Sequence, residues 1–214
     1  MLRPKLVLAT RSGHKVRELR ELLELENADV VSIGDVDVAD EPIGEAVESG
    51  RTFEANAALK ARFAARATGL PALADDSGLE VDALGGGPGV RTRRYAGPDA
   101  TDAENNAKLL DALAGLPPER RGARYVCVLA LALPERVGPR AGLPVVLRRG
   151  TSRGRIAPAP RGTGGFGYDP IVEPLAEPPG GRTFGEYSAR EKSAISHRGR
   201  AARRMSAELR RLGF

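Results

Sequence analysis

The order of apolar and polar residues along the chain predicts an α/β protein. Short runs of apolar residues are typical of buried strands, and they occur at residues 5–10, 30–33, 72–81, 123–133 and 143–147, the last continuing extended to residue 156. Elsewhere apolar residues recur every three or four positions, which is the pattern of a helix with one buried face. This spacing predicts helices at residues 15–26, 52–67, 101–114 and 193–212.

The chain of 214 residues is long enough for one large domain or two small lobes around an apolar core. No internal repeat or linker interrupts the pattern, so we expect a single domain over residues 1–214. No apolar run approaches the roughly 20 residues of a membrane helix, and no leader with a cleavage site precedes the first strand. The one cysteine, Cys127, excludes an internal disulfide and lies in an apolar run. We therefore expect a cytoplasmic protein that does not contact the membrane.

The charge balance is basic, with a net charge of +5 and a sequence pI of about 9.7. A basic protein is a candidate for binding nucleic acid, but two observations oppose this. Of the 33 basic residues 28 are Arg, beside abundant Ala, Gly and Pro, which indicates a compositional bias of the coding sequence. The chain also has only five Phe, four Tyr and no Trp on which single-stranded nucleic acid could stack. We expect no stable binding of nucleic acid.

The stretch at residues 72–81, for which we expect a strand and a return, carries two neighbouring carboxylates, Asp75 and Asp76, followed by Ser77 and Gly78. Neighbouring side chains of a strand point to opposite faces, although a bend at Ser77 and Gly78 would bring the two acids closer. Paired carboxylates can hold a hard cation and polarise a water molecule. Asp, Ser and Gly are also common in solvated turns, so the motif alone leaves both interpretations open.

A short polar turn at residues 11–14 joins the first strand to the first helix. In a strand–turn–helix unit the free backbone N–H groups and the helix dipole point at the turn, which suits a phosphate. Thr10 and Ser12 add hydroxyl donors, and Lys15 adds a cation. The Gly-x4-Gly-Lys-Ser/Thr pattern of a P-loop is absent. A solvated turn with a solvated lysine remains the alternative.

A glycine-rich segment follows later, with four glycines among residues 162–167. Glycines let the backbone approach a ligand closely, and Phe166 and Tyr168 could form the wall of a flat pocket. A flexible loop with buried aromatic residues is the alternative. The start of the last predicted helix adds three donors suited to a base or a phosphate: Lys192, His197 and Arg198.

Five motifs, in order and covering nearly the whole chain, resemble the Ham1-type inosine triphosphate pyrophosphatase family. They are Leu-Ala-Thr at 8–10 with Lys-Val-Arg-Glu-Leu at 15–19, Thr-Phe-Glu-Ala-Asn-Ala at 52–57 with Lys-Ala at 60–61, Ala-Asp-Asp-Ser-Gly-Leu at 74–79, residues 162–170, and Lys-Ser-Ala-Ile-Ser-His-Arg-Gly at 192–199. The resemblance implies an elongated mixed β-sheet flanked by helices, in two lobes with a central substrate cleft. It also implies hydrolysis of ITP, dITP and XTP to the monophosphate and pyrophosphate, with Mg²⁺, in a homodimer.

Position by position, the resemblance makes Asp76 the general base and, together with Glu48, a metal ligand, with Asp75 beside the metal site. The residues implied for the triphosphate are Thr10, Arg11, Ser12, Gly13, His14, Lys15 and Lys60. The residues implied for other parts of the substrate are Ser77, Phe166, Gly167, Tyr168, Asp169, Lys192, His197 and Arg198. The family usually has Asn at the position of Ser12, so a phosphate contact there would pass through water or through the backbone.

Two alternative functions stay open. A Maf-like nucleotide pyrophosphatase would apply the same chemistry to modified pyrimidine or methylated nucleotides, and its preference among bases would reveal it. A basic nucleic-acid-binding module fits the Arg-rich last helix and the high pI, but the pair of acids and the few aromatic residues oppose it.

Overall fold

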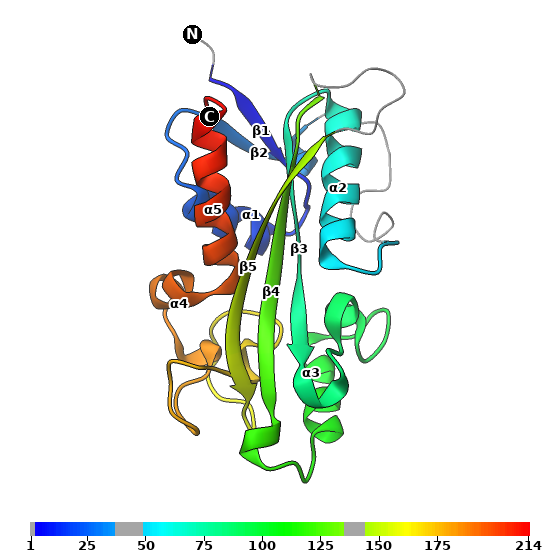
Figure 1. The fold of residues 1–214 in the computed structure, drawn as a ribbon, viewed down its shortest axis with the longest axis vertical. Helices are drawn as coiled ribbons and strands as arrows, with labels where there is room; N and C mark the ends of the chain where they lie inside the picture. Colours follow the sequence, from blue (N-terminus) through cyan, green and yellow to red (C-terminus); the bar gives the residue numbers. More distant parts are fainter. Residues whose placement is uncertain (1–2, 37–48, 135–143) are drawn as a thin grey trace. The chain divides into compact units, whose positions relative to one another are not determined.

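The computed structural model describes residues 3–36, 49–134 and 144–214, which form a mixed six-stranded sheet with helices (Figure 1). The strands are β1 (Lys5–Leu8), β2 (Asp29–Ser32), β3 (Ala72–Val81), β4 (Gly122–Ala132), β5 (Val145–Ile156) and β6 (Val172–Pro174). The helices are α1 (Gly13–Leu23), α2 (Phe53–Thr68), α3 (Asp102–Ala112), α4 (Ala189–Ile195) and α5 (His197–Arg211). The strand order is β2-β1-β3-β4-β5-β6, with β1 parallel to β2 and β3 and with β5 antiparallel to β6. The predicted α/β class with a mixed sheet is confirmed.

Contacts within the chain divide it into two compact units. The first unit comprises Met1–Asp76, Cys127–Arg149 and Ala201–Phe214, and the second comprises Ser77–Val126 and Gly150–Arg200. The boundaries fall within β3, β4 and α5 and inside β5, so each of these elements contributes residues to both units. A single domain of two lobes with a central cleft stays a prediction.

The apolar core of the first unit lies against α1 and α5. Leu8 of β1, Leu73 of β3 and Cys127 of β4 belong to one buried cluster with Leu19 of α1 and Met205 of α5. Cys127, which lies in an apolar run of the sequence, is thus a buried free cysteine of this core. Figure 1 shows α1 and α5 on one side of these strands and α2 on the other.

Helix α2 begins and ends where its sequence predicts. The N-cap Thr52 accepts a hydrogen bond from the Ala55 N–H at 3.1 Å, which satisfies one of the free donors of the first turn. Alanine, the best helix former, supplies most of the buried face of α2. The helix ends at Gly69, whose φ of 66° is left-handed and therefore favours glycine.

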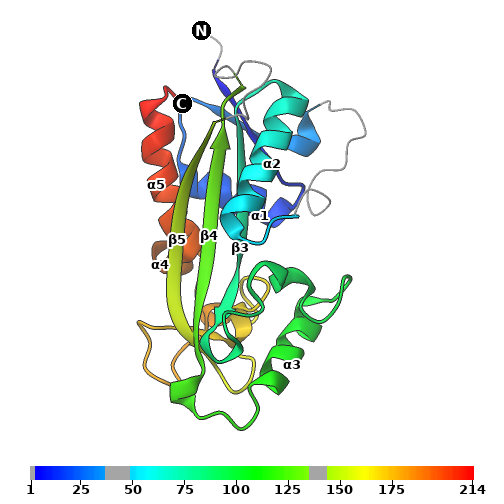
Figure 2. The ribbon, with the colours of Figure 1, turned by 45° about the vertical axis from the view of Figure 1, so that its right-hand side comes forward.

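The second unit has its own core around α3. Thr101 and Glu104 form a reciprocal capping box that fixes the first turn of α3. Leu109 of α3 packs with Leu79 of β3 and Tyr125 of β4 in the buried cluster of this unit. Figure 2 shows α3 lying beside the part of β3 that belongs to this unit.

The single helix predicted at residues 193–212 is wrong, because two helices, α4 and α5, meet at Ser196. Ser196 has an extended backbone with φ −68° and ψ 157°, and its hydroxyl accepts a hydrogen bond from the Gly199 N–H at 3.0 Å. A serine that caps the next turn in this way competes with continuation of the helix. At Gly199 a Cβ atom would lie 2.0 Å from the Ser193 carbonyl oxygen, so the tight junction requires glycine.

No helix among the described residues is both long and apolar enough to cross a membrane.

Candidate functional site

The two carboxylates of β3 are buried and belong to the first unit. Asp75 is 3% exposed and Asp76 is 7% exposed, so the solvated turn considered for this motif is wrong. The strand continues through Ser77 and Gly78 to Val81, and the bend that would bring the acids together is also absent from it. Alternation along β3 therefore directs Asp75 to the face of α1 and Asp76 to the face of α2.

Each carboxylate forms an ion pair with a lysine from a different helix. The Nζ of Lys15, in the first turn of α1, lies 3.0 Å from Asp75 Oδ1. The Nζ of Lys60, in α2, lies 3.1 Å from Asp76 Oδ1, and both of these side chains are at most 10% exposed. Because an ionised carboxylate is costly to bury without a partner, the lysines stabilise the two acids at these positions.

The second oxygen of Asp76 is held by a residue that the sequence analysis did not assign to the site. Asn56 Nδ2 donates to Asp76 Oδ2 at 3.2 Å, and Asn56 Oδ1 accepts from the Gly50 N–H at 2.8 Å. A Cβ atom at Gly50 would lie 2.6 Å from Asn56 Oδ1, so this approach requires glycine. Asn56 and Lys60 are four residues apart and share a helix face. The sequence signal that could have identified Asn56 is its position one turn before Lys60 in an Ala-rich helix.

The predicted phosphate-binding residues around the first turn occupy the segment between β1 and α1 and the first turn of α1. They are Thr10, Arg11, Ser12, Gly13, His14 and Lys15. Ser12 is the N-cap of α1, but its side chain forms no capping hydrogen bond, and its N–H donates to Thr10 Oγ1 at 3.2 Å. The N-terminus of α1 and the exposed Arg11 give this turn a positive character that suits an anion.

In the second unit, Asp169 connects several predicted residues. Asp169 is 2% exposed, and its carboxylate accepts hydrogen bonds from Lys192 Nζ at 2.6 Å, the Phe166 N–H at 2.8 Å and the Tyr125 hydroxyl at 3.3 Å. Burial, with the nearby Asp169 carboxylate as the next cause, raises the pKa of Tyr125 well above its usual value. Tyr125 therefore stays a neutral donor. The loop also approaches Asp169 closely at Gly165, where a Cβ atom would lie 2.0 Å from Asp169 Oδ2.

Phe166 presents an aromatic ring near two cations. Its side chain is one of the exposed large apolar groups, at 36% exposure, with Lys192 Nζ 4.9 Å and the Arg198 guanidinium carbon 5.5 Å from the ring centroid. Such distances are typical of cation–π contacts. Tyr168 differs, because it is buried in the core and donates its hydroxyl to the Thr92 carbonyl at 2.9 Å. Of the two aromatic residues predicted to form the wall of a flat pocket, Phe166 therefore remains the candidate.

The donors expected near the start of the last helix lie close to this group. Arg198, 1% exposed, donates from its Nη2 to Ser77 Oγ at 2.9 Å. The His197 ring stacks on the Tyr125 ring, with centroids 4.6 Å apart and 12° between the planes. Apart from Tyr168, the predicted residues of the second unit thus form one connected group around Asp169 and Phe166.

The described residues include only part of the metal site that was predicted from the sequence. None of them form a group of three or more His, Cys, Asp and Glu side chains suited to a metal ion. Asp75 and Asp76 face opposite sides of β3, so they do not act as the paired ligands that the sequence suggested. Glu48, the other predicted ligand, lies outside the described residues.

Comparison with known proteins identifies relatives over nearly the whole chain. A profile of the Ham1 family matches residues 6–208. The dITP/XTP pyrophosphatase of Syntrophobacter fumaroxidans is 51% identical over 92% of this chain and 78% of its own length, and that of Shigella flexneri is 49% identical over 96% and 98%. The solved structure of a HAM1 protein from Coxiella burnetii is 41% identical, with a TM-score of 0.82 over 97% of this chain and 99% of that one. The chain therefore belongs to the Ham1 family.

Proposed function

We propose that this protein hydrolyses the non-standard purine nucleoside triphosphates ITP, dITP and XTP to the nucleoside monophosphate and pyrophosphate. Its membership of the Ham1 family and the names of its curated relatives support this reaction. The observation that carries the proposal is the buried Asp76 carboxylate, oriented by Lys60 and Asn56 in a chain with a strand–turn–helix anion site. Removal of such triphosphates would prevent their incorporation into nucleic acid.

In this proposal Asp76 accepts a proton from water as the water attacks the α-phosphorus. The bond from the α-phosphorus to the bridging oxygen breaks, so water and the triphosphate give the monophosphate and pyrophosphate. Lys15, Lys60 and the N–H groups at the start of α1 neutralise the triphosphate, because electrostatic stabilisation and positioning carry most of such a transfer. The lysines that pair with Asp75 and Asp76 are then also the cations of the phosphate site.

Magnesium dependence is part of the proposal. The Asp76 carboxylate supplies the oxygen donor that Mg²⁺ prefers, and Asp76 and Glu48 would hold the ion. Bound there, Mg²⁺ would neutralise charge on the phosphate oxygens as the bond breaks. Asn56 and Lys60 would keep the Asp76 carboxylate oriented whether or not the ion is present.

In this proposal, the second-unit group around Phe166 recognises the base. The ring of Phe166 would stack on the base, and Lys192, His197 and Arg198 would donate to the 6-oxo group of hypoxanthine or xanthine. The 6-amino group of adenine cannot accept these hydrogen bonds, and buried donors left without an acceptor are costly. Asp169 would hold Lys192 in place for this role.

We also propose that the enzyme works in the cytoplasm as a homodimer and forms no stable complex with nucleic acid. Sedimentation of the purified protein tests the oligomeric state. Titration with duplex DNA at physiological salt tests the nucleic-acid alternative, because phosphate-dominated binding would show a steep dependence on salt.

A product assay tests the reaction itself. The protein is incubated with Mg²⁺ and ITP, dITP, XTP, GTP, ATP or a modified pyrimidine triphosphate, and pyrophosphate is distinguished from orthophosphate. Pyrophosphate mainly from ITP, dITP and XTP supports the proposal. Pyrophosphate mainly from the pyrimidine keeps the chemistry but favours the Maf-like alternative, and no turnover of any triphosphate with Mg²⁺ or Mn²⁺ refutes the proposal.

A further inference from the structure

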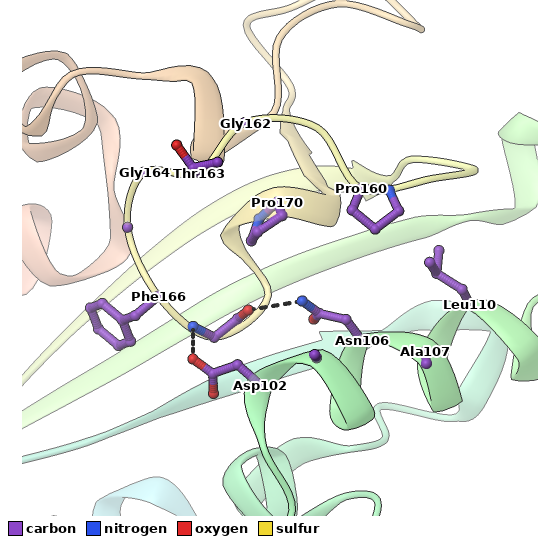
Figure 3. A pocket seen from close by; sticks show the side chains of 13 residues that line it. Asp102, Asn106, Ala107, Leu110, Pro160, Gly162, Thr163, Gly164, Phe166 and Pro170 are labelled. Carbon is purple, nitrogen blue, oxygen red and sulfur yellow. Dashed lines mark hydrogen bonds between the residues drawn. The ribbon is translucent and has the colours of Figure 1, made fainter.

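Helix α3 of the second unit holds the glycine loop, which we define as residues 162–169. The Asp102 carboxylate, in the first turn of α3, accepts a hydrogen bond from the Gly167 N–H at 2.7 Å. One turn later, Asn106 Nδ2 donates to the Gly167 carbonyl oxygen at 3.1 Å. Figure 3 shows both hydrogen bonds, with Asp102 and Asn106 on the helix face that points to the loop. Two side chains of α3 thus fix both polar groups of one loop residue.

A cavity separates the rest of the glycine loop from α3. The cavity has a volume of about 460 Å³ and is lined on one side by α3, including Ala107 and Leu110, and on the other by loop residues from Gly162 to Gly167. Side chains therefore do not fill this space, so α3 does not support this part of the loop by packing. On the side of α3, the two hydrogen bonds at Gly167 hold the glycine loop. On its other side, the Gly164 N–H donates to the Gly185 carbonyl at 2.8 Å and the Phe166 N–H donates to Asp169 at 2.8 Å.

Gly167 is the residue directly after Phe166, and its backbone is unusual. Its φ of 64° is left-handed, although no atom lies within 4 Å of the place where a Cβ would stand. The conformation is thus not imposed by crowding at Gly167. Asp102 accepts from the peptide group that joins Phe166 to Gly167, and Asn106 donates to the next peptide group, so together they hold the backbone that follows Phe166.

The helix that provides these two groups is itself firmly anchored. Asn105, 2% exposed, accepts a hydrogen bond from the Ala96 N–H at 2.8 Å and donates to the Arg93 carbonyl at 2.9 Å. The capping box of Thr101 with Glu104 and the fully buried Leu109 fix the same stretch of α3. A rigid support of this kind is what a positioning role requires.

We infer that Asp102 and Asn106 are positioning residues for base recognition, because they hold Gly167 and thereby place the Phe166 ring to stack on the purine. This inference rests on the proposed function and adds two residues to it. Neither residue touches the substrate in this scheme. Their loss would weaken binding of the base equally in the ground state and the transition state, which raises KM and leaves kcat nearly unchanged.

The experiment compares Asp102→Ala and Asn106→Ala with the wild-type protein and with Asp111→Ala, a control that removes an exposed acid from the same helix. Loss of one hydrogen bond should raise the KM for ITP about 3- to 10-fold in each test variant, with kcat within about twofold of wild type. Inorganic tripolyphosphate serves as a competitive inhibitor without a base, and its inhibition constant should not change. The control should behave as wild type in all three measurements.

Two further variants separate positioning from a general structural effect. Asp102→Asn keeps an oxygen that can accept from the Gly167 N–H, so it should restore a KM near that of wild type. The double variant Asp102→Ala/Asn106→Ala should raise KM by less than the product of the single effects, because both residues hold the same loop residue, Gly167.

The outcomes distinguish this inference from the proposed function. Wild-type turnover of ITP with an unchanged KM in both alanine variants would overturn the inference and leave the proposed function standing. An equal rise in the tripolyphosphate inhibition constant would also overturn it, since the damage would then extend beyond the base. If Asn106→Ala fails to fold, the variants Asp102→Ala and Asp102→Asn decide the question, because they change an exposed residue. An inactive wild-type protein would refute the proposed function and the inference together.

Discussion

Replacing Lys60 with methionine should leave the buried Asp76 carboxylate without its cation. The two charges lie 3.1 Å apart and their side chains are 6% and 10% exposed. At an effective dielectric constant of about 20, two unit charges at this separation attract each other by about 5 kcal/mol. Methionine is similar in length and apolar, so the change removes the charge while keeping most of the volume of the side chain.

The loss of stability has an upper limit, because the protein can protonate Asp76 instead of burying its charge. Protonating an ordinary aspartate costs about 4 kcal/mol at pH 7 and about 1.5 kcal/mol at pH 5, from a reference pKa of about 3.9. Breaking a buried ion pair typically costs about 3–5 kcal/mol. We therefore expect Lys60→Met to lower the free energy of unfolding by about 3–4 kcal/mol at pH 7 and by less than about 2 kcal/mol at pH 5.

Thermal denaturation of the variants at pH 7 and pH 5 measures this effect. In a chain of this size, the expected loss corresponds to a Tm lower by about 6–16 °C at pH 7. Lys60→Met/Asp76→Asn removes both charges and should regain most of the stability, and Lys5→Met, which removes an exposed lysine of the same unit, should change little. An equal loss at both pH values, or a double variant as unstable as Lys60→Met, would refute the electrostatic explanation.

Three more changes test other parts of the molecule. Asp76→Asn should lower kcat for ITP by at least about 10²-fold, with circular dichroism showing a folded protein, and near-normal turnover would exclude Asp76 as the base. Arg198→Ala should narrow the ratio of kcat/KM for ITP over ATP, because a buried donor is lost from the base-reading group; an unchanged ratio would argue against this role. Hydrogen bonds from Ser188 and then Arg182 lower the pKa of Glu191 from 4.5 to about 2, so the stability it contributes is present above pH 4.5 and is lost as the pH falls toward 2. Wild type should therefore lose stability more steeply than Glu191→Gln in acid titrations between these pH values, and identical curves would contradict the assignment.

The elements that the sequence predicted well are those with strong local signals. Helices were predicted at residues 52–67 and 101–114, and the structure has α2 and α3 there, capped by Thr52 and Thr101, with Gly69 at the end of α2. The failure at residues 193–212 has a local cause, since Ser196 can cap a new turn as easily as it can continue a helix. Apolar spacing persists across that junction, and spacing alone therefore cannot reveal it. Helix α1 likewise ends at Leu23, before the predicted residue 26, because Glu24 adopts a left-handed φ of 48°.

Side-chain partners were harder to predict than elements. The motif around Asp76 could be recognised, but the role of Asn56 depends on Gly50, six residues earlier, and on a strand 20 residues later. Tyr168 was misjudged for a different reason. An aromatic ring fits both a pocket wall and a position in the core, and only the burial of the side chain in the structure distinguishes the two. Contacts between distant segments arise from packing, which local patterns do not encode.

The alternation of β3 gives its two acids different tasks. Asp75 meets Lys15 on the face of α1, whereas Asp76 meets Lys60 and Asn56 on the face of α2. Asp75 is 3% exposed and pairs with Lys15, which is 25% exposed. In the proposed function, Asp75 would therefore orient the cation of the predicted phosphate turn, whereas Asp76 would activate water. A strand that carries neighbouring charges to both of its faces thus holds one lysine from each of two helices, and the proposed function assigns both lysines to the triphosphate. Exchanging the two roles would require shifting the strand by one residue, which would turn every buried side chain of β3 to the wrong face.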